Sequence, residues 1–320
     1  MVGNTQNSTQ RNSEKYALLS VYDKTGIAEF ATQLSSLGYQ IISTGGTAKV
    51  LRENNIKVIP IAEITGNPES FDGRMKTVSF QVESGILFDR DNPKHVEEAK
   101  KLHIKPIDIV VCNLYPFEKE QTIENIDVGG PTMIRSAGKN FKHVLAVIDP
   151  KDYQEVILQL QQEHVLLNFK KRLAAKAFAH LSFYDAQIAN YLREEQFPAE
   201  LTLPLRKSHD LRYGENPHQK SALYLFPNTK SVFQNLIKRA GRDLSLTNIS
   251  DINAGVESVR LFKEPCAVVI KHNNPCGIAL GKSSKEALMR AIEADPESAF
   301  GGVIVLNLPM DLKTARLISS

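Results

Sequence analysis

Short apolar runs alternate with amphipathic segments through the first sixty residues of the chain. Three runs, at residues 16–21, 39–43 and 57–61, have the length and the mostly apolar character of buried strands. Between them, residues 26–38 and 47–55 repeat apolar side chains every three or four positions, which predicts helices. Strands that alternate with helices favour a parallel sheet covered by helices, so we predict an α/β fold.

The same alternation continues further along the chain. Residues 107–114 and 143–148 are further strand candidates. A helix is expected to begin near Pro131, because proline suits the first turn of a helix. Residues 172–192 space apolar side chains by three or four, which predicts one long amphipathic helix.

The periodicity stops in residues 197–208, which contain two prolines. We therefore predict a domain boundary in this stretch, with a first domain over residues 15–200 and a second over residues 201–320. Residues 1–14 are largely polar and are expected to form a disordered tail. In the second domain, a strand candidate at residues 266–270 leads into a polar turn.

Composition narrows the class of protein. A chain of 320 residues suits roughly two domains of about 150 residues. With 39 basic and 36 acidic residues, its charge is too balanced for nucleic-acid or membrane binding by bulk electrostatics. Three cysteines indicate a reducing compartment, and we find neither a signal peptide nor an apolar run long enough to span a membrane. We therefore expect a cytoplasmic protein that binds neither nucleic acid nor membranes.

Two predicted turns between a strand and a helix suit a phosphate group. Residues 20–26 and 43–49 each combine small hydroxyl residues, glycine and a lysine. The N–H groups at a helix start bind anions, and glycine lets a phosphate approach. The alternative is simple helix capping by Thr25, Thr44 or Thr47. Two such turns on adjacent strands favour the phosphate, because ligands gather where parallel strands end.

The loop over residues 63–80 brings Asp72, Arg74, Lys76 and Thr77 together around a glycine. Arg74 and Lys76 would face the same side of an extended segment. The loop could be solvated surface. It could also be a site for an anionic substrate, with Lys76 stabilising an oxyanion.

Two further stretches carry polar side chains that suit chemistry. Tyr115, Asp127 and Lys139 could transfer protons at one edge of the sheet. Alternatively, Asp127 caps a helix, and Lys139 interacts with the dipole at its end. In the second domain, residues 211–219 form a polar turn that is unusually dense in hydrogen-bonding side chains, which a connecting turn alone does not require.

Eight stretches of the chain occur in an order that is informative as a set. They are SVYDKTGI, STGGTAKVL, DGRMKT, CNLYPF, IDVGGPTMIRSAGKN, AAKAF, LRYGENPHQ and KHNNPCG. Over about residues 15–305, this series resembles a family of bifunctional purine-biosynthesis proteins. These combine phosphoribosylaminoimidazolecarboxamide (AICAR) formyltransferase with IMP cyclohydrolase.

The resemblance implies that the first domain has a methylglyoxal-synthase-like fold and closes the ring of formyl-AICAR, with loss of water, to give IMP. The implied contacts to the nucleotide phosphate are Ser20, Lys24, Thr44, Gly45, Gly46 and Thr47. The implied ring-closure groups are Arg74, Lys76, Thr77, Asn113, Tyr115, Asp127 and Lys139, of which Lys76, Tyr115, Asp127 and Lys139 are the catalytic candidates. A cation would stabilise the oxyanion while the acid and base groups move protons, and no metal or redox cofactor is needed.

The second domain resembles part of the formyltransferase, with a cytidine-deaminase-like fold and 10-formyltetrahydrofolate as cosubstrate. Its implied AICAR contacts are Arg212, Tyr213, His218 and Asn253. Its implied catalytic pair is His272, as base, and Lys271. The family implies a homodimer that binds purine nucleotides. Because the chain stops soon after residue 305, we expect an incomplete transferase domain that is inactive in formyl transfer.

The chain departs from the usual family pattern in one loop. Residues 78–80 replace Leu-His-Pro, Glu83 and Ser84 occupy a later His-Gly region, and Tyr22 stands where a smaller hydroxyl residue is common. One alternative is therefore a purine-nucleotide-binding module in which the altered loop has ended catalysis. Another is a methylglyoxal synthase, against which the motifs of the second domain argue.

The polar turn after residue 270 also contains Cys276, which could be a nucleophile or a metal ligand. Cys266 and Cys276 lie ten residues apart, without the Cys-x-x-Cys spacing or the His-x-Glu partner of a deaminase-type zinc site. We therefore expect no metal site, and a packing role for Cys276.

Overall fold

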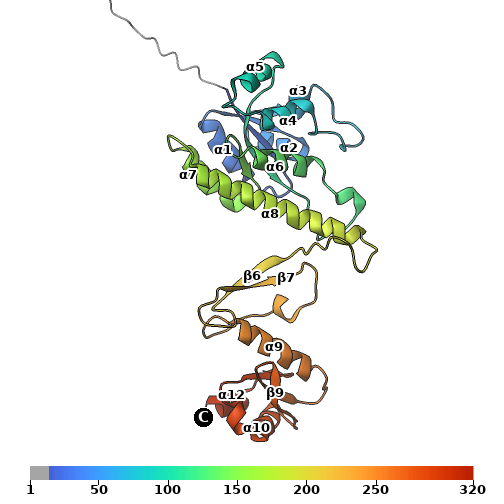
Figure 1. The fold of residues 1–320 in the computed structure, drawn as a ribbon, viewed down its shortest axis with the longest axis vertical. Coiled ribbons are helices and arrows are strands. Elements are labelled where there is room, and N and C mark those ends of the chain that lie inside the picture. Colours follow the sequence, from blue (N-terminus) through green and yellow to red (C-terminus); the bar gives the residue numbers. More distant parts are fainter. Residues whose placement is uncertain (1–13, 320) are drawn as a thin grey trace, which may run out of the picture. The chain divides into compact units, whose positions relative to one another are not determined.

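The computed structural model describes residues 14–319 of the chain. The tail predicted over residues 1–14 lies outside them except for Glu14. The chain divides into two compact units, Met1–Pro204 and Leu205–Ser320, each of which is described by itself (Figure 1). The predicted boundary between residues 200 and 201 lies four residues before this division.

The first unit is built on a five-stranded sheet in the order β3-β2-β1-β4-β5, in which every pairing is parallel. The strands are β1 (Lys15–Val21), β2 (Tyr39–Ser43), β3 (Val58–Pro60), β4 (Ile107–Asn113) and β5 (Leu145–Val147). The predicted parallel α/β architecture of this unit is confirmed. Since all strands run in one direction, their carboxyl ends lie at the same edge of the sheet.

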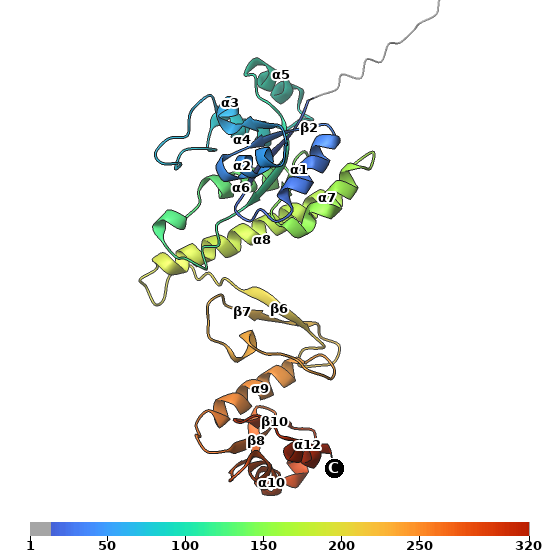
Figure 2. The same cartoon turned by 180° about the vertical axis from the view of Figure 1, so that it is seen from behind.

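Helices cover both faces of this sheet (Figures 1 and 2). They are α1 (Ile27–Ser36), α2 (Gly45–Glu53), α3 (Ile61–Thr65), α4 (Phe80–Leu87), α5 (Pro93–Lys101), α6 (Gly129–Lys139), α7 (Tyr153–Leu160) and α8 (Leu167–Leu192), with short 3-10 turns η1 (Ile123–Asn125) and η2 (Pro150–Asp152). The predicted helix near Pro131 begins at Gly129, so the proline lies in its first turn. The long predicted helix begins at Leu167, five residues earlier than the periodicity indicated.

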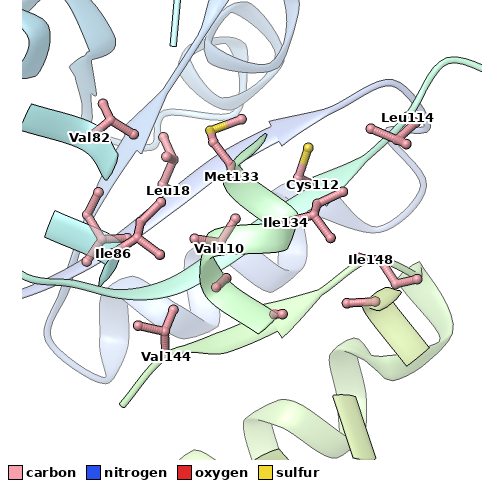
Figure 3. Close-up of a cluster of buried hydrophobic side chains, with 14 of the residues drawn as sticks. Leu18, Val82, Ile86, Val110, Cys112, Leu114, Met133, Ile134, Val144 and Ile148 are labelled. Atoms are coloured by element: carbon pink, nitrogen blue, oxygen red, sulfur yellow. The ribbon is translucent and has the colours of Figure 1, made fainter. Parts of the chain in front are cut away.

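Two apolar cores fill the spaces between the sheet and its helices. Leu18 and Val110 point to one face, where they pack with Val82 of α4 and Met133 of α6 (Figure 3). Their neighbours along the strands point to the other face and pack against α1, α2 and α7. This alternation follows from the two-residue period of a strand. The sheet is therefore buried on both sides, and its strand ends are the places left for polar side chains.

The second unit contains antiparallel sheets. One has the order β10-β8-β9, and the other pairs β6 with β7. Its strands are β6 (Arg206–Leu211), β7 (Ser221–Leu225), β8 (Cys266–Lys271), β9 (Asn274–Leu280) and β10 (Val303–Leu306). Its helices are η3 (Val232–Gln234), α9 (Leu246–Val259), α10 (Ser284–Ala294), α11 (Pro296–Ala299) and α12 (Leu312–Ser319). Apolar residues of α9 and of α10 pack against β8 in two separate clusters.

Crossing a bilayer takes a helix that is both long and strongly apolar. No helix among residues 14–319 meets both requirements.

Candidate functional site

The loops that follow β1 and β2 meet at the carboxyl edge of the parallel sheet. Ser20 lies near the end of β1 and Thr44 directly follows β2. Their hydroxyl oxygens are 2.9 Å apart. The two strand-to-helix turns that were predicted to hold a phosphate are therefore neighbours in space, as the strand order requires.

Asn113, at the end of β4, holds the turn after β1 in place. Its Oδ1 accepts hydrogen bonds from the backbone N–H groups of Tyr22 (2.7 Å) and Asp23 (2.8 Å), and its Nδ2 donates to the carbonyl of Asp23 (3.1 Å). These three bonds make Asn113 a positioning residue for the turn. Its predicted contact with substrate stays a prediction.

The threonine side chains of the two turns do not cap the helices, so the capping alternative is wrong. Gly26, with φ of +67°, is the N-cap of α1, and Thr44, the N-cap of α2, forms no side-chain capping bond. Thr47 instead accepts a hydrogen bond from the N–H of Val21 and donates one to its carbonyl, both at 3.0 Å. Thr25 donates to Asp23. The two turns are thus tied together through their own side chains.

Two lysines converge on the pair of glycines that begins α2. A Cβ built on Gly45 would lie 2.5 Å from Nζ of Lys76, and a Cβ built on Gly46 would lie 3.9 Å from Nζ of Lys24. Only glycine leaves room for the Lys76 ammonium at this distance. A helix start favours negative charge, and two ammonium groups beside it strengthen that preference. The start of α2 therefore has the chemistry of an anion site.

The loop that carries Lys76 is folded back on itself. Ser70 and Met75 form an isolated antiparallel bridge, and residues 71–73 all have positive φ. The backbone turns just before Arg74, and the expectation that Arg74 and Lys76 face the same side stays a prediction. Arg74 is exposed and forms a salt bridge with Glu124.

The end of the same loop links α2 to α6. Lys76 forms a salt bridge with Glu69 (3.0 Å) beside the glycines of α2. The next residue, Thr77, is buried, and a Cβ built on Gly129 would lie 2.5 Å from its Oγ1. Two adjacent residues of one loop thus reach the starts of two different helices.

Asp127 lies just before α6 and caps it, as the structural alternative predicted. Its Oδ1 accepts a hydrogen bond from the N–H of Gly130 (3.0 Å). Burial raises the pKa of Asp127, and the N–H groups of Gly130 and Gly129 partly oppose this rise. A carboxyl group with a raised pKa is suited to proton transfer.

Tyr115 lies at the edge next to the turn after β1. Half of it is exposed, and its ring contacts that of Tyr22, with centroids 5.0 Å apart. Tyr22, one of the positions that depart from the family pattern, therefore packs against a predicted catalytic residue.

Lys139 does not lie with Tyr115 and Asp127, so the prediction that the three share one edge is wrong. It is the last residue of the 11-residue helix α6, whereas Asp127 precedes the first. Such a helix is about 16 Å long, which exceeds the reach of a lysine side chain. A role for Lys139 in catalysis stays a prediction from the resemblance alone.

In the second unit, Lys271 and His272 lie at the tip of a hairpin. Lys271 pairs with Asn274 at the ends of β8 and β9, which leaves His272 and Asn273 as a two-residue turn with φ of +54° and +65°. Lys271 Nζ donates a hydrogen bond to the carbonyl of Phe300 (3.1 Å). The turn predicted in this stretch is confirmed, although Gly277 lies inside β9.

Helix α9 connects this hairpin with the other predicted residues of the unit. Asp251 of α9 accepts a hydrogen bond from the N–H of Asn273 (2.8 Å), and the N–H of Leu246 donates to the carbonyl of Tyr213 (3.0 Å). Arg212 stacks on Tyr213, with the guanidinium carbon 4.8 Å from the ring centre. Asp251 was missed at the sequence level, because nothing in the local pattern shows what a helical aspartate contacts.

The remaining predicted residues of this unit are less connected. His218 and Asn253 are both exposed. Cys276 is partly buried, and its thiol contacts the carbonyl of Ser298 at 3.7 Å.

Among residues 14–319, one group has the spacing of metal ligands: Asp89, Asp91 and His143. His143 pairs with Asp89, and Lys142 forms a salt bridge with Asp91. These ion pairs already balance the charge that a cation would need.

Models of two protein families match the chain. Residues 26–132 match the MGS-like domain, and residues 137–320 match the AICARFT/IMPCHase bienzyme. The second match covers more than half of the chain.

Individual relatives agree with the family models. The chain is 47% identical over 318 residues to the bifunctional purine biosynthesis protein PurH of Thermoanaerobacter sp. (strain X514), and 44% identical over 320 residues to that of Persephonella marina. These alignments cover 94% and 95% of the chain and 62% of each relative, so the chain spans less than two thirds of their length. A solved structure titled "Crystal structure of ForH" is 36% identical, with a TM-score of 0.51, and is matched over its whole length by 57% of this chain.

Proposed function

Because the chain belongs to the AICARFT/IMPCHase bienzyme family, we propose that its first unit closes the purine ring of formyl-AICAR to form IMP. The convergence of Lys24 and Lys76 on Gly45 and Gly46 is the observation that carries this proposal. In this proposal Lys24, Ser20 and Thr44 contact the phosphate of the nucleotide at the start of α2, whereas Lys76, which reaches α2 from the loop that leads to α6, faces the formyl group. The loop ending in Thr77 then leads from this anion site to the start of α6, where Asp127 lies.

The reaction forms one bond and loses one water molecule. The carboxamide nitrogen attacks the formyl carbon, and the formyl oxygen becomes an alkoxide. The Lys76 ammonium stabilises this negative charge. Asp127 takes a proton from the attacking nitrogen, and the alkoxide is protonated to a hydroxyl. A ring nitrogen then gives up its remaining proton as a C=N bond forms, while the hydroxyl takes up a second proton and leaves as water. Tyr115, which is exposed at the same edge, is the candidate donor of that proton.

Substitutions of the two central residues test this proposal. Lys76→Ala and Asp127→Asn should each lower the rate of IMP formation from formyl-AICAR by at least about 100-fold, because each removes a group that acts on the reacting atoms. The measurement is IMP absorbance with purified protein. Lys94→Ala, at an exposed lysine of α5, is the control and should retain the rate.

Two outcomes would favour the alternatives. IMP binding seen by calorimetry, without turnover at any protein concentration, would indicate a nucleotide-binding module. Methylglyoxal formed from dihydroxyacetone phosphate would indicate a methylglyoxal synthase.

We propose further that the second unit is part of an AICAR formyltransferase domain with a cytidine-deaminase-like fold, acting in a cytoplasmic homodimer. In this proposal His272 is the base for the AICAR amine, Lys271 assists the folate side, and 10-formyltetrahydrofolate is the cosubstrate. The hairpin that presents both residues, tied to Asp251, supports it. Release of tetrahydrofolate in the presence of AICAR tests the activity, and sedimentation tests the dimer.

A further inference from the structure

Tyr184 is a buried tyrosine of α8 whose hydroxyl contacts the segment that leads into α6. Its OH accepts a hydrogen bond from the N–H of Asp127 (2.8 Å) and donates one to the carbonyl of Asn125 (3.0 Å). The side chain is 3% exposed. One hydroxyl therefore holds two backbone groups on either side of Ile126.

The ring of Tyr184 is itself fixed by packing. It lies edge-on to Phe117, with centroids 6.1 Å apart and an interplanar angle of 73°, and both rings belong to the core between the sheet and α6. Burial raises the pKa of Tyr184, so the hydroxyl keeps its proton and can donate to Asn125 throughout the neutral range. Packing thus holds the ring in place, and the hydroxyl keeps its donor proton at neutral pH.

The carboxyl group of Asp127 is held from the opposite side. Its Oδ1 accepts from the N–H of Gly130, and a Cβ built on Gly130 would lie 2.4 Å from its Oδ2. The backbone of Asp127 is thus fixed by Tyr184 and its carboxylate by the first turn of α6. Without the hydroxyl, the backbone N–H of Asp127 would lose its hydrogen bond to Tyr184. We then expect the backbone of Asp127 to move more, which would loosen the hydrogen bond between its carboxylate and the N–H of Gly130.

We propose that Tyr184 is a positioning residue for ring closure, which fixes the backbone of Asp127 so that its carboxylate meets the start of α6 in one orientation. This inference rests on the proposed function, because it assigns Asp127 to proton transfer. Tyr184 itself touches only backbone groups, and α8 places it outside the phosphate site.

Tyr184→Phe, made in the full chain, tests the proposal because it removes only the hydroxyl. We expect kcat to fall about tenfold, because a misplaced catalytic group loses much of its effect, while KM stays within about twofold because the phosphate site is untouched. A loosened bond from Gly130 should also raise the pKa of Asp127, so the acidic limb of the kcat/KM profile should move to higher pH. Within residues 14–319, Cys112 of β4 and Tyr184 itself interact electrostatically with Asp127, and burial raises the pKa of both, so neither ionises in this range.

Tyr153→Phe is a matched control. Tyr153 is a buried tyrosine of α7, stacked on Phe30 at 4.2 Å, and its hydroxyl forms no hydrogen bond with any residue of the described part of the chain. The same atom is removed without loss of a hydrogen bond, so kcat and the acidic limb should match those of the unmodified protein.

The carboxyl pKa of Asp127, measured by ¹³C NMR and assigned with Asp127→Asn, separates the two proposals. If the unmodified protein forms no IMP, the proposed function fails. In that case NMR alone decides the positioning role of Tyr184. A higher pKa of Asp127 in Tyr184→Phe, with an unchanged pKa in Tyr153→Phe, would support the role. An unchanged Asp127 pKa and acidic limb in Tyr184→Phe would overturn it, even if kcat and the melting temperature both fall.

Discussion

Gly45 combines two requirements in one residue of the site. Its φ is +37°, in the left-handed region, and the Lys76 ammonium occupies the space where a Cβ would stand. The positive φ means that any other residue at position 45 would strain the backbone, and the nearby ammonium means that a side chain there would displace Lys76. A glycine with a positive φ but with no neighbouring side chain can separate these two effects.

We expect Gly45→Ala to lower kcat/KM for formyl-AICAR at least about tenfold, because the flexible ammonium would be pushed away from the start of α2. Gly38→Ala is the control, since Gly38 has φ of +87° and no atom within 4 Å of an added Cβ. Both variants introduce strain of about 1 kcal/mol, and only the first displaces Lys76. Equal losses of activity in steady-state assays of the two variants would contradict this explanation.

Sequence reasoning succeeded at single residues where local order fixes the position. It predicted that the turns carrying Lys24, Gly45 and Gly46 lie side by side, because a turn between a strand and a helix has a fixed relation to the sheet. It could not find the role of Tyr184, which the helical spacing marked only as one more buried position. The hydroxyl meets Asp127, 57 residues away, and no local pattern encodes that meeting.

At the scale of elements, α4 accommodates the loop that departs from the family pattern. Ser79 caps the helix by accepting a hydrogen bond from the N–H of Val82, which is fully buried. Glu83 accepts a hydrogen bond from Ser136 of α6, while its Oε1 is buried without a partner in the described part of the chain. The altered loop thus leads into a regular helix, in which the buried carboxyl group of Glu83 is expected to lower stability.

The pH dependence of stability should reveal that group. Burial raises the pKa of Glu83 above its ordinary 4.5, so the folded state binds a proton that the unfolded state releases. Folding stability therefore falls as pH rises from 4.5 through the raised value. We expect Glu83→Gln to raise the melting temperature at pH 8 and to have little effect at pH 4. Calorimetry at both pH values checks this, and Glu53→Gln, at an exposed position of α2, should show no such difference.

The predicted elements also show where a periodic pattern is insufficient. The strands of the first unit and its helices α1, α2 and α8 followed from apolar spacing, whereas α3, α4, α5 and α7 were not predicted. The cap by Asp127 followed from its place before a helix. The grouping of Lys139 with Asp127 failed because the two residues lie at opposite ends of α6. A pattern tells which side of a helix a residue faces, whereas an active site also depends on distance along the axis.

At the scale of the whole molecule, each unit has its own core. The two large apolar clusters of the sheet draw all their residues from the first unit, and the clusters around β8 draw theirs from the second. We therefore propose that the domain boundary is a boundary of folding as well.

A protein ending at residue 204 tests this proposal. It should unfold in one cooperative transition and form IMP with a kcat/KM within about threefold of the full chain, because a domain with its own core can fold alone. Circular dichroism and the IMP assay are the measurements. An aggregated or inactive product would contradict independence, provided that the full chain is active.

The hairpin tip in the second unit adopts a backbone conformation that costs stability. A histidine with φ of +54° sits in a conformation that is about 1 kcal/mol less favourable than for glycine, and the adjacent Asn273 is also left-handed. Selection for thermal robustness alone would replace His272 with glycine, the residue that two-residue hairpins favour. Under the proposed transferase role, His272 therefore gives up backbone stability in exchange for an imidazole at the hairpin tip, and a design aimed only at stability would remove that imidazole.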